Sequence, residues 1–246
     1  GTHTSAVAGP GIVFSGNSKQ NLTRSSNGSS LFGTITIDNG NNVEITGNDR
    51  NFEINHKVIL TDGLFNIGSN LLLMDNDAFF ESGIGGTGRT DFTSNNMVTV
   101  NASLIDQGVR KVFDDYTGSE LTFLYPVGLG DYTPVEVVYT GMDASTANTG
   151  FITVKPVAEY VGGISDDDES CEGSSGTSNY VDEDNVLQYH WILKSSNITD
   201  FDGRFLMYHV NSHEALDIPT GQGFPAYTLA NYTPTRSLDV SSSWDK

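Results

Sequence analysis

The stretch from residue 31 to residue 81 decides the fold, and it reads LFGTITIDNGNNVEITGNDRNFEINHKVILTDGLFNIGSNLLLMDNDAFFE. Short apolar segments recur in it every six to nine residues, and Asn, Gly or Asp fills nearly every gap. That spacing is too short for helices with connections, and it is typical of short strands joined by tight turns. The segments begin at Thr34, Val43, Phe52, Val58, Leu64, Leu71 and Ala78.

Every third segment lies about 20 residues further along the chain, which is the period of a coiled repeat. A regular coil with three short strands per turn has this signature, so the sequence predicts a parallel β-solenoid. Residues 1–30 resemble one more coil, with Ile12, Phe14 and Leu22 pointing inward. The recurring pairs are Val43 with Leu64, Phe52 with Leu71, and Val58 with Ala78.

From Leu121 onward the strands become longer, and turn signals separate them, which is typical of an antiparallel β-sandwich. We therefore predict an all-β chain with a solenoid at residues 1–116 and a sandwich at residues 117–246. In the strand around Trp191, the side with Leu187, Tyr189 and Leu193 is bulky and is expected to face the core. The predicted strands are Leu121–Tyr125, Pro134–Tyr139, Phe151–Lys155, Leu187–Lys194, Gly203–Val210, Ala226–Leu229 and Arg236–Val240.

The composition excludes several classes of function. The chain has 246 residues, and 31 acidic against 12 basic residues give a net charge of −19. Such a surface repels nucleic acid and anionic lipid. No apolar run is long enough to span a membrane, so we expect no membrane insertion. Cys171 is the only cysteine, which leaves no disulfide framework and no zinc cluster.

A long acidic loop at residues 162–185 interrupts the predicted sandwich and is the main candidate for a metal site. Calcium takes six to eight oxygen ligands and accepts irregular loops, so we predict calcium as the one candidate cofactor. The alternatives are a solvated acidic hairpin for the loop and a type I turn for the Asp-x-Asp-Gly segment at residues 200–203. The candidate ligands are Asp166, Asp167, Asp168, Glu169, Asp182, Asp184, Asp200 and Asp202.

Solenoids can also carry polysaccharide lyases and hydrolases, so an enzyme is the alternative prediction. A lyase acting on acidic sugars needs cationic groups, and a hydrolase needs two neighbouring carboxylates. A serine-hydrolase elbow, a P-loop and a Rossmann fingerprint are all absent, which favours a protein without catalytic activity. The candidate cations are Lys57, Arg89, Arg110 and Lys111, and the carboxylates that a single face could carry are Glu44, Glu53, Asp62 and Glu81.

Aromatic residues in the second half offer a further reading, since sugars stack on exposed rings. Glycan binding is therefore a second candidate, and core packing is the competing explanation, favoured for Trp191 and Tyr189. The other candidate rings are Tyr116, Tyr125, Tyr132, Tyr139, Tyr160, Tyr180, Tyr227, Tyr232 and Trp244.

Several motifs resemble a recurring pattern in secreted, multi-domain surface proteins and adhesins of the Bacteroidetes, which the type IX secretion system often exports. The resemblance covers roughly residues 10 to 210 and implies a cell-surface protein without an assigned activity. No sorting domain of that family is recognised, which predicts a section of a longer chain. The matching segments are Gly11–Gly16, Gln20–Thr23, Leu60–Leu64, Asn70–Leu73, Phe123–Gly128, Tyr132–Val135 and Leu187–Ile192.

The residues and the resemblance together predict a non-enzymatic structural or adhesion module at the bacterial cell surface. A solenoid ends in unpaired strand edges, so we expect neighbouring domains or a homo-oligomer, including a fibre, to cover the end near Gly1.

Overall fold

The computed structural model describes residues 11–23, 30–47, 51–101, 107–144, 150–158 and 189–210, together with the backbone of residues 236–239 and 243–245. Within these residues the secondary structure consists of strands and one short 3-10 helix, η1 (Arg89–Asp91). The predicted all-β class is therefore confirmed.

The chain divides into two compact units, one comprising Gly1–Val157 with Trp191–Val210 and the other Ala158–His190 with Asn211–Lys246. In the second unit, β18 (Arg236–Asp239) pairs antiparallel with β19 (Ser243–Asp245). All the contacts described below lie within the first unit.

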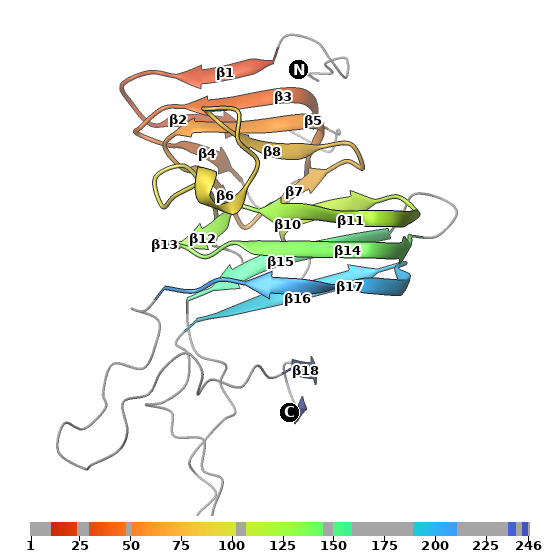
Figure 1. Ribbon diagram of the computed structural model, residues 1–246. Helices are drawn as coiled ribbons and strands as arrows, with labels where there is room; N and C mark the ends of the chain where they lie inside the picture. Colours follow the sequence, from red (N-terminus) through yellow and green to blue (C-terminus); the bar gives the residue numbers. More distant parts are fainter. Residues whose placement is uncertain are drawn as a thin grey trace, which may run out of the picture. The chain divides into compact units, whose positions relative to one another are not determined.

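Parallel pairs build most of two sheets, and the chain returns repeatedly from one sheet to the other (Figure 1). Each return places a new strand beside the strand laid down in the previous passage. The first sheet contains β1 (Ile12–Ser15), β3 (Ser30–Asp38), β5 (Asn51–Asp62), β7 (Leu71–Met74) and β10 (Gly108–Phe113), with β8 (Phe79–Ser82) beside the second half of β5. The second contains β2 (Gln20–Thr23), β4 (Val43–Thr46), β6 (Phe65–Gly68), β9 (Val98–Val100), β12 (Val127–Leu129) and the antiparallel β13 (Asp131–Tyr132).

The strands pair in the order that the repeat predicted, with registers shifted by one or two residues. Val43 lies beside Phe65 rather than Leu64, and Val58 lies beside Phe80 rather than Ala78. Alternate residues of each strand point to the same side, so residues in register form columns through the core. One such column runs through Ile35, Val58 and Phe80, whose exposed fractions are 0%, 0% and 3%.

Buried asparagines hold the corners between strands. Asn39 is 1% exposed, and its Nδ2 donates to the Ser18 carbonyl at 2.8 Å and to Gln20 Oε1 at 2.9 Å. Asn70 is fully buried, and its Nδ2 donates to the carbonyls of Gly47 and Ile67 at 2.9 and 2.8 Å. Each side chain therefore bonds to the preceding passage of the chain and fixes its distance.

The remaining strands are antiparallel. In a three-stranded sheet, β14 (Val135–Asp143) lies between β11 (Tyr116–Tyr125) and β17 (Thr199–Met207), while β15 (Gly150–Val157) joins β10 and is followed by β16 (His190–Ser196). Phe113 on β10 contacts the rings of Phe123 and Tyr139 at centroid distances of 6.1 and 5.6 Å. The Tyr125 hydroxyl donates to the Ile152 carbonyl at 2.9 Å, so these two sets of strands share a core.

Five of the seven strands predicted after Leu121 correspond to β11, β14, β15, β16 and β17, and Arg236–Val240 corresponds to β18. Trp191 and Leu193 pack against the core, as predicted. Tyr189 is 1% exposed. Leu187 and Ala226–Leu229 lie outside the described residues.

Strands from both sides of the predicted domain boundary at residues 116 and 117 share the two large sheets. The later strands β12 and β15 pair with β9 and β10 respectively. We refer below to β1–β10 with β12 as the parallel section, and to β11 with β14–β17 as the antiparallel section.

Candidate functional site

Six of the eight predicted calcium ligands lie outside the described residues, namely Asp166, Asp167, Asp168, Glu169, Asp182 and Asp184. The other two, Asp200 and Asp202, lie in β17, so the alternative prediction of a type I turn at residues 200–203 is wrong. A register shift opposite Gly141 accommodates Asp200, whose φ is +47°. Asp202 Oδ2 accepts a hydrogen bond from Thr140 Oγ1 at 2.7 Å.

The described part of the chain brings no three His, Cys, Asp or Glu side chains together in a metal-binding arrangement. Calcium binding therefore remains a prediction that concerns the acidic loop.

Two of the four candidate cations make separate contacts on the first sheet. Lys57 Nζ forms an ion pair with Glu81 at 3.1 Å, and both side chains are about four-fifths buried. The Arg110 guanidinium lies 3.9 Å from the centre of the Phe151 ring, and its Nε donates to Thr153 Oγ1 at 3.0 Å. Both cations are thus held by partners within their own sheet.

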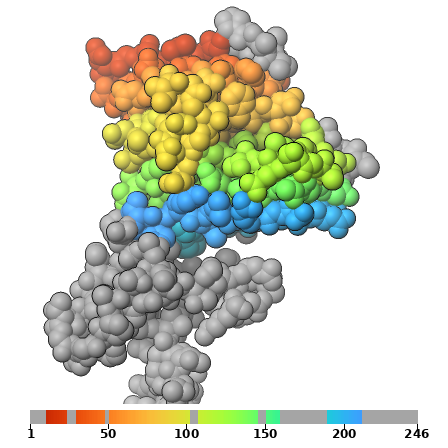
Figure 2. Space-filling model, viewed as in Figure 1, coloured from red at the N-terminus to blue at the C-terminus, as the bar shows by residue number. Residues whose placement is uncertain are grey.

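Arg89 fastens the glycine-rich loop at residues 83–96 to the antiparallel section. Its guanidinium lies 4.2 Å from the centre of the Tyr208 ring, and its carbonyl accepts from the Tyr132 hydroxyl at 2.9 Å. The Tyr208 hydroxyl donates to Glu136 Oε2 at 2.8 Å. Burial raises the pKa of Tyr132 well above its usual value, so the hydroxyl stays a donor at neutral pH. Figure 2 shows the loop in yellow reaching across this face toward the blue strands.

Lys111 is buried in the core and is not available to bind a sugar. It is 5% exposed, and its Nζ donates to the carbonyls of Asp75 at 2.5 Å, Ala78 at 2.8 Å and Asn76. The four candidate cations therefore have different neighbours and do not form one cluster. Lys111 lies in the core.

The candidate carboxylates are also distributed over different parts of the two sheets. Glu44 is in β4 of the second sheet, where it forms an ion pair with Lys19. Glu53, Asp62 and Glu81 belong to the first sheet, so the hypothesis of one face carrying all four is wrong. Burial, and secondarily the charge of Asp75, raises the pKa of Glu53.

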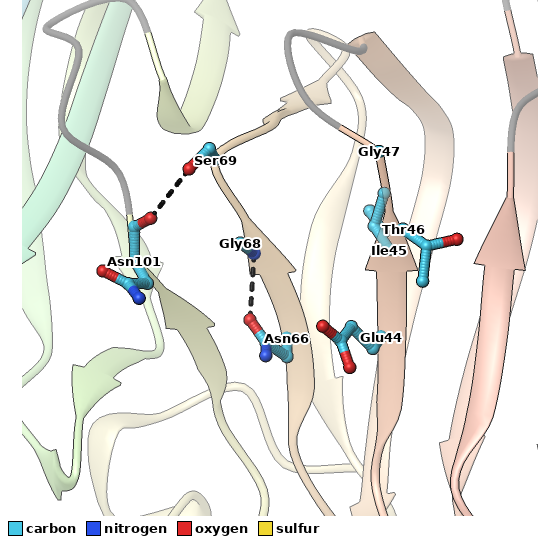
Figure 3. Close-up of a pocket in the computed structure, with 8 residues that line it drawn as sticks. All are labelled: Glu44, Ile45, Thr46, Gly47, Asn66, Gly68, Ser69 and Asn101. Atoms are coloured by element: carbon cyan, nitrogen blue, oxygen red, sulfur yellow. Dashed lines mark hydrogen bonds between the residues drawn. The ribbon is translucent and has the colours of Figure 1, made fainter.

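A shallow polar hollow of about 260 Å³ lies on the second sheet and is the candidate binding site (Figure 3). Glycines 47 and 68 leave space at the ends of β4 and β6, because neither carries a side chain there. Asn66 Oδ1 accepts from the Gly68 amide at 2.9 Å, and Ser69 Oγ donates to the Asn101 carbonyl at 3.0 Å. The hollow is lined by Glu44, Ile45, Thr46, Gly47, Asn66, Gly68, Ser69 and Asn101.

Among these residues the sequence predicted only Glu44, as one of four carboxylates on a single face rather than as part of a hollow. The hollow depends on which residues of neighbouring strands lie in register, such as Glu44 beside Asn66. The available signal was the pair of glycines that each follow or end a short strand, at residues 47 and 68.

Among the residues that the structure describes, the aromatic side chains considered for sugar stacking serve the core or the antiparallel section. Tyr125 and Tyr189 are buried, and the Trp191 indole donates to the Thr133 carbonyl at 3.0 Å. Tyr116 and Tyr139 pack edge to face at 5.5 Å, and burial raises the pKa of Tyr139. Tyr160, Tyr180, Tyr227, Tyr232 and Trp244 lie where the structure describes no side chains.

Comparison of the chain with protein-family models, with curated proteins and with solved structures found no match. The resemblance to Bacteroidetes surface proteins therefore stays a prediction. Within the described residues, no helix is long and apolar enough to cross a membrane.

Proposed function

We propose that this chain is a non-enzymatic structural or adhesion module of an extracellular bacterial surface protein. In this proposal the parallel section is a β-solenoid and the antiparallel section is a β-sandwich that covers one end of it. The resemblance to Bacteroidetes cargo of the type IX secretion system supports the location, and the net charge of −19 suits a medium in which calcium and other cations screen carboxylates.

The observation that carries the proposal is the repeated parallel register. Ile12, Ile35, Val58 and Phe80 follow one another at 23, 23 and 22 residues, each beside the next. Coils that bond only to their neighbours along one axis make a stiff rod, which suits a spacer or a scaffold. The candidate cations support the same conclusion, because ion pairing, ring stacking or burial engages each of them.

The edge strand β1 is where a further coil, a neighbouring domain or a second copy would add. Among the described strands β1 pairs only with β3, and Val13 on β1 is 60% exposed. The inward residues Ile12 and Phe14 are only partly buried, whereas Ile35 and Ile37 beside them are 0% exposed. The inward side chains of β1 are thus more exposed than those of β3, which supports the addition of a further coil or chain against β1.

Self-assembly is tested by sedimentation of the concentrated protein, with electron microscopy of any polymer. A charge on an edge strand opposes strand addition, so Val13→Lys is expected to abolish the assembly. The matched control is Ile84→Lys, because Ile84 is 87% exposed and lies in the glycine-rich loop rather than in an edge strand. A protein that stays monomeric at high concentration would contradict the proposed fibre.

A second candidate function is glycan binding at the polar hollow. Its amide, hydroxyl and carboxylate groups suit the hydroxyls of a neutral sugar, and the described residues that line it include no lysine or arginine to attract an acidic one. A glycan array with neutral and acidic polysaccharides tests this, and Asn66→Ala is expected to abolish binding while the exposed Asn95→Ala is not. Cleavage of any polysaccharide on the same panel would instead favour the lyase or hydrolase alternative.

A further inference from the structure

Lys111 occupies a position that the repeat of the parallel section reserves for an apolar residue. In register, Ile54 of β5 lies beside Met74 of β7, and Met74 lies beside Lys111 of β10. Ile54 and Met74 are 0% exposed, and Lys111 is 5% exposed. Val109 and Phe113 on the same side of β10 are also buried. The Lys111 side chain therefore enters the core from the same face as these apolar residues.

Three backbone carbonyls receive the ammonium group. Lys111 Nζ donates to the carbonyls of Asp75, Asn76 and Ala78, which form the corner between β7 and β8. A lysine ammonium has three N–H donors, so each donor has an acceptor of its own. The group also lies 5.1 Å from the centre of the Phe123 ring, which attracts a cation through its π electrons.

The corner lies where the single strand β5 of the first sheet pairs with two shorter strands, β7 and β8. The first half of β5 pairs with β7 and the second half pairs with β8, while β10 pairs with β7. Phe123 belongs to β11, which pairs with β14 in the antiparallel section. One ammonium thus contacts the corner of the parallel section and a ring of the antiparallel section.

We propose that the carbonyls of residues 75, 76 and 78 form a cradle for a monovalent cation, which the chain fills with its own Lys111 ammonium to lock the parallel section to β11. The three hydrogen bonds of the ammonium go to neutral carbonyls, although the charges of Asp75, Asp77 and Asp114 also act on Lys111. The Asp114 carboxylate accepts from Asn76 Nδ2 at 2.6 Å, which further ties the residue after β10 to the corner.

The chemistry of the cradle predicts which cations it takes. Ammonium and methylammonium can donate to carbonyls as the lysine does, whereas tetramethylammonium has no N–H donor. The planar guanidinium of an arginine presents its donors as a fork and fits this arrangement poorly. The small, tightly hydrated magnesium ion demands octahedral coordination, so it is not expected in a cradle of three carbonyls.

The test is chemical rescue of Lys111→Ala. Shortening the side chain leaves space beside the carbonyls, so ammonium or methylammonium is expected to raise the Tm of this variant by roughly 2–4 °C more than tetramethylammonium at equal ionic strength. Lys57→Ala is the matched control, because it removes a lysine that bonds to the Glu81 carboxylate rather than to the corner carbonyls. Equal effects of the ions on Lys111→Ala, or the same difference in Lys57→Ala, would overturn the proposal.

Amide hydrogen exchange of Lys111→Met supplies a second test if Lys111→Ala does not fold. The Asp75 and Ala78 amides, which bond to the Ile54 and Asp75 carbonyls, are expected to exchange at least about tenfold faster than in the parent chain. The Ile35 amide within β3 is expected to keep its rate. Unchanged exchange at the corner would show that the ammonium does not lock it.

Discussion

At the scale of single residues, the clearest effect of the fold is on polar groups that the core encloses. Lys111, Asn39 and Asn70 are each at most 5% exposed, and each bonds to carbonyls of neighbouring segments. These contacts satisfy backbone acceptors at corners where the strand ladders end. Removing these hydrogen bonds should therefore destabilise the corners before the strands.

The first prediction concerns the pH dependence of stability. Burial lowers the pKa of Lys111 to about 8, although Asp75, Asp77 and Asp114 act in the opposite direction. Between about pH 8 and the ordinary value of 10.5, the unfolded chain holds this proton while the folded chain releases it. The unfolding free energy contributed by Lys111 should therefore rise with pH in that window.

Urea unfolding of the parent chain and of Lys111→Met, at about pH 7.5 and about pH 10, measures this contribution as a difference. The parent chain is expected to gain stability relative to the variant as the pH rises. A difference that is constant across the window would show that the folded and unfolded chains hold the proton equally.

The second prediction concerns the buried asparagine at residue 70. Asn70→Ala removes the two hydrogen bonds to the Gly47 and Ile67 carbonyls and should lower the unfolding free energy by about 2–3 kcal/mol. Asn95→Ala, at an exposed position in the glycine-rich loop, should change it by less than about 0.5 kcal/mol. Denaturant titration of both variants makes the comparison, and equal effects would contradict a special role for Asn70.

At the scale of elements, most strands of the parallel section have three or four residues, and the corners between strands decide how closely successive passages of the chain approach. Gly63 has φ +81°, and a Cβ there would lie 1.9 Å from the Asn39 carbonyl oxygen. Gly85 has a similar φ of +84°, but a Cβ there would meet nothing within 4 Å. The two glycines therefore share a backbone conformation, but only Gly63 lies close to another segment of the chain.

The third prediction uses this pair of glycines. Gly85→Ala should cost only the strain of a positive φ, about 1–2 kcal/mol. Gly63→Ala must also displace the backbone of the corner at Asn39, so it should cost about 3 kcal/mol or more. Thermal or denaturant unfolding of the two variants gives the difference. Equal losses would mean that the two passages do not meet as closely as the structure has them.

At the scale of the whole molecule, the net charge of −19 and the acidic loop lead us to expect that stability depends on cations. Bulk salt screens the repulsion among the acidic residues and should raise the Tm. A specific calcium site would add to this, because a ligand bound only by the folded chain stabilises it by mass action.

The fourth prediction is therefore a calcium-specific rise in Tm above the effect of sodium chloride at the same ionic strength. Chelator should remove the rise, and asparagine in place of Asp166, Asp167, Asp168 and Glu169 should abolish it. The Asp62→Asn variant is the control for a carboxylate outside the loop. No calcium-specific shift in the parent chain would exclude the loop as a stabilising calcium site.

The sequence by itself determined the strands and their order of pairing, because alternation and turn residues are local signals that recur every 20 to 23 residues. Val43 begins a strand as predicted, whereas the separate short strands predicted at Phe52 and Val58 are one continuous strand, β5. The partners of these three residues differ from the predicted ones by one or two residues. The alternation of β10 also carried a signal for Lys111, which shares a side with Val109 and Phe113.

Only the tertiary structure decided what those positions meet. The corner carbonyls that hold Lys111 lie 33 to 36 residues earlier in the chain, and the hollow beside Glu44 requires β4, β6 and Asn101 to lie together. A local pattern specifies which way a side chain points, whereas its partners depend on register and on corner geometry between distant segments. That is why the sequence predicted Lys111 only as a candidate cation for an acidic sugar, whereas in the folded chain its ammonium bonds to corner carbonyls in the core.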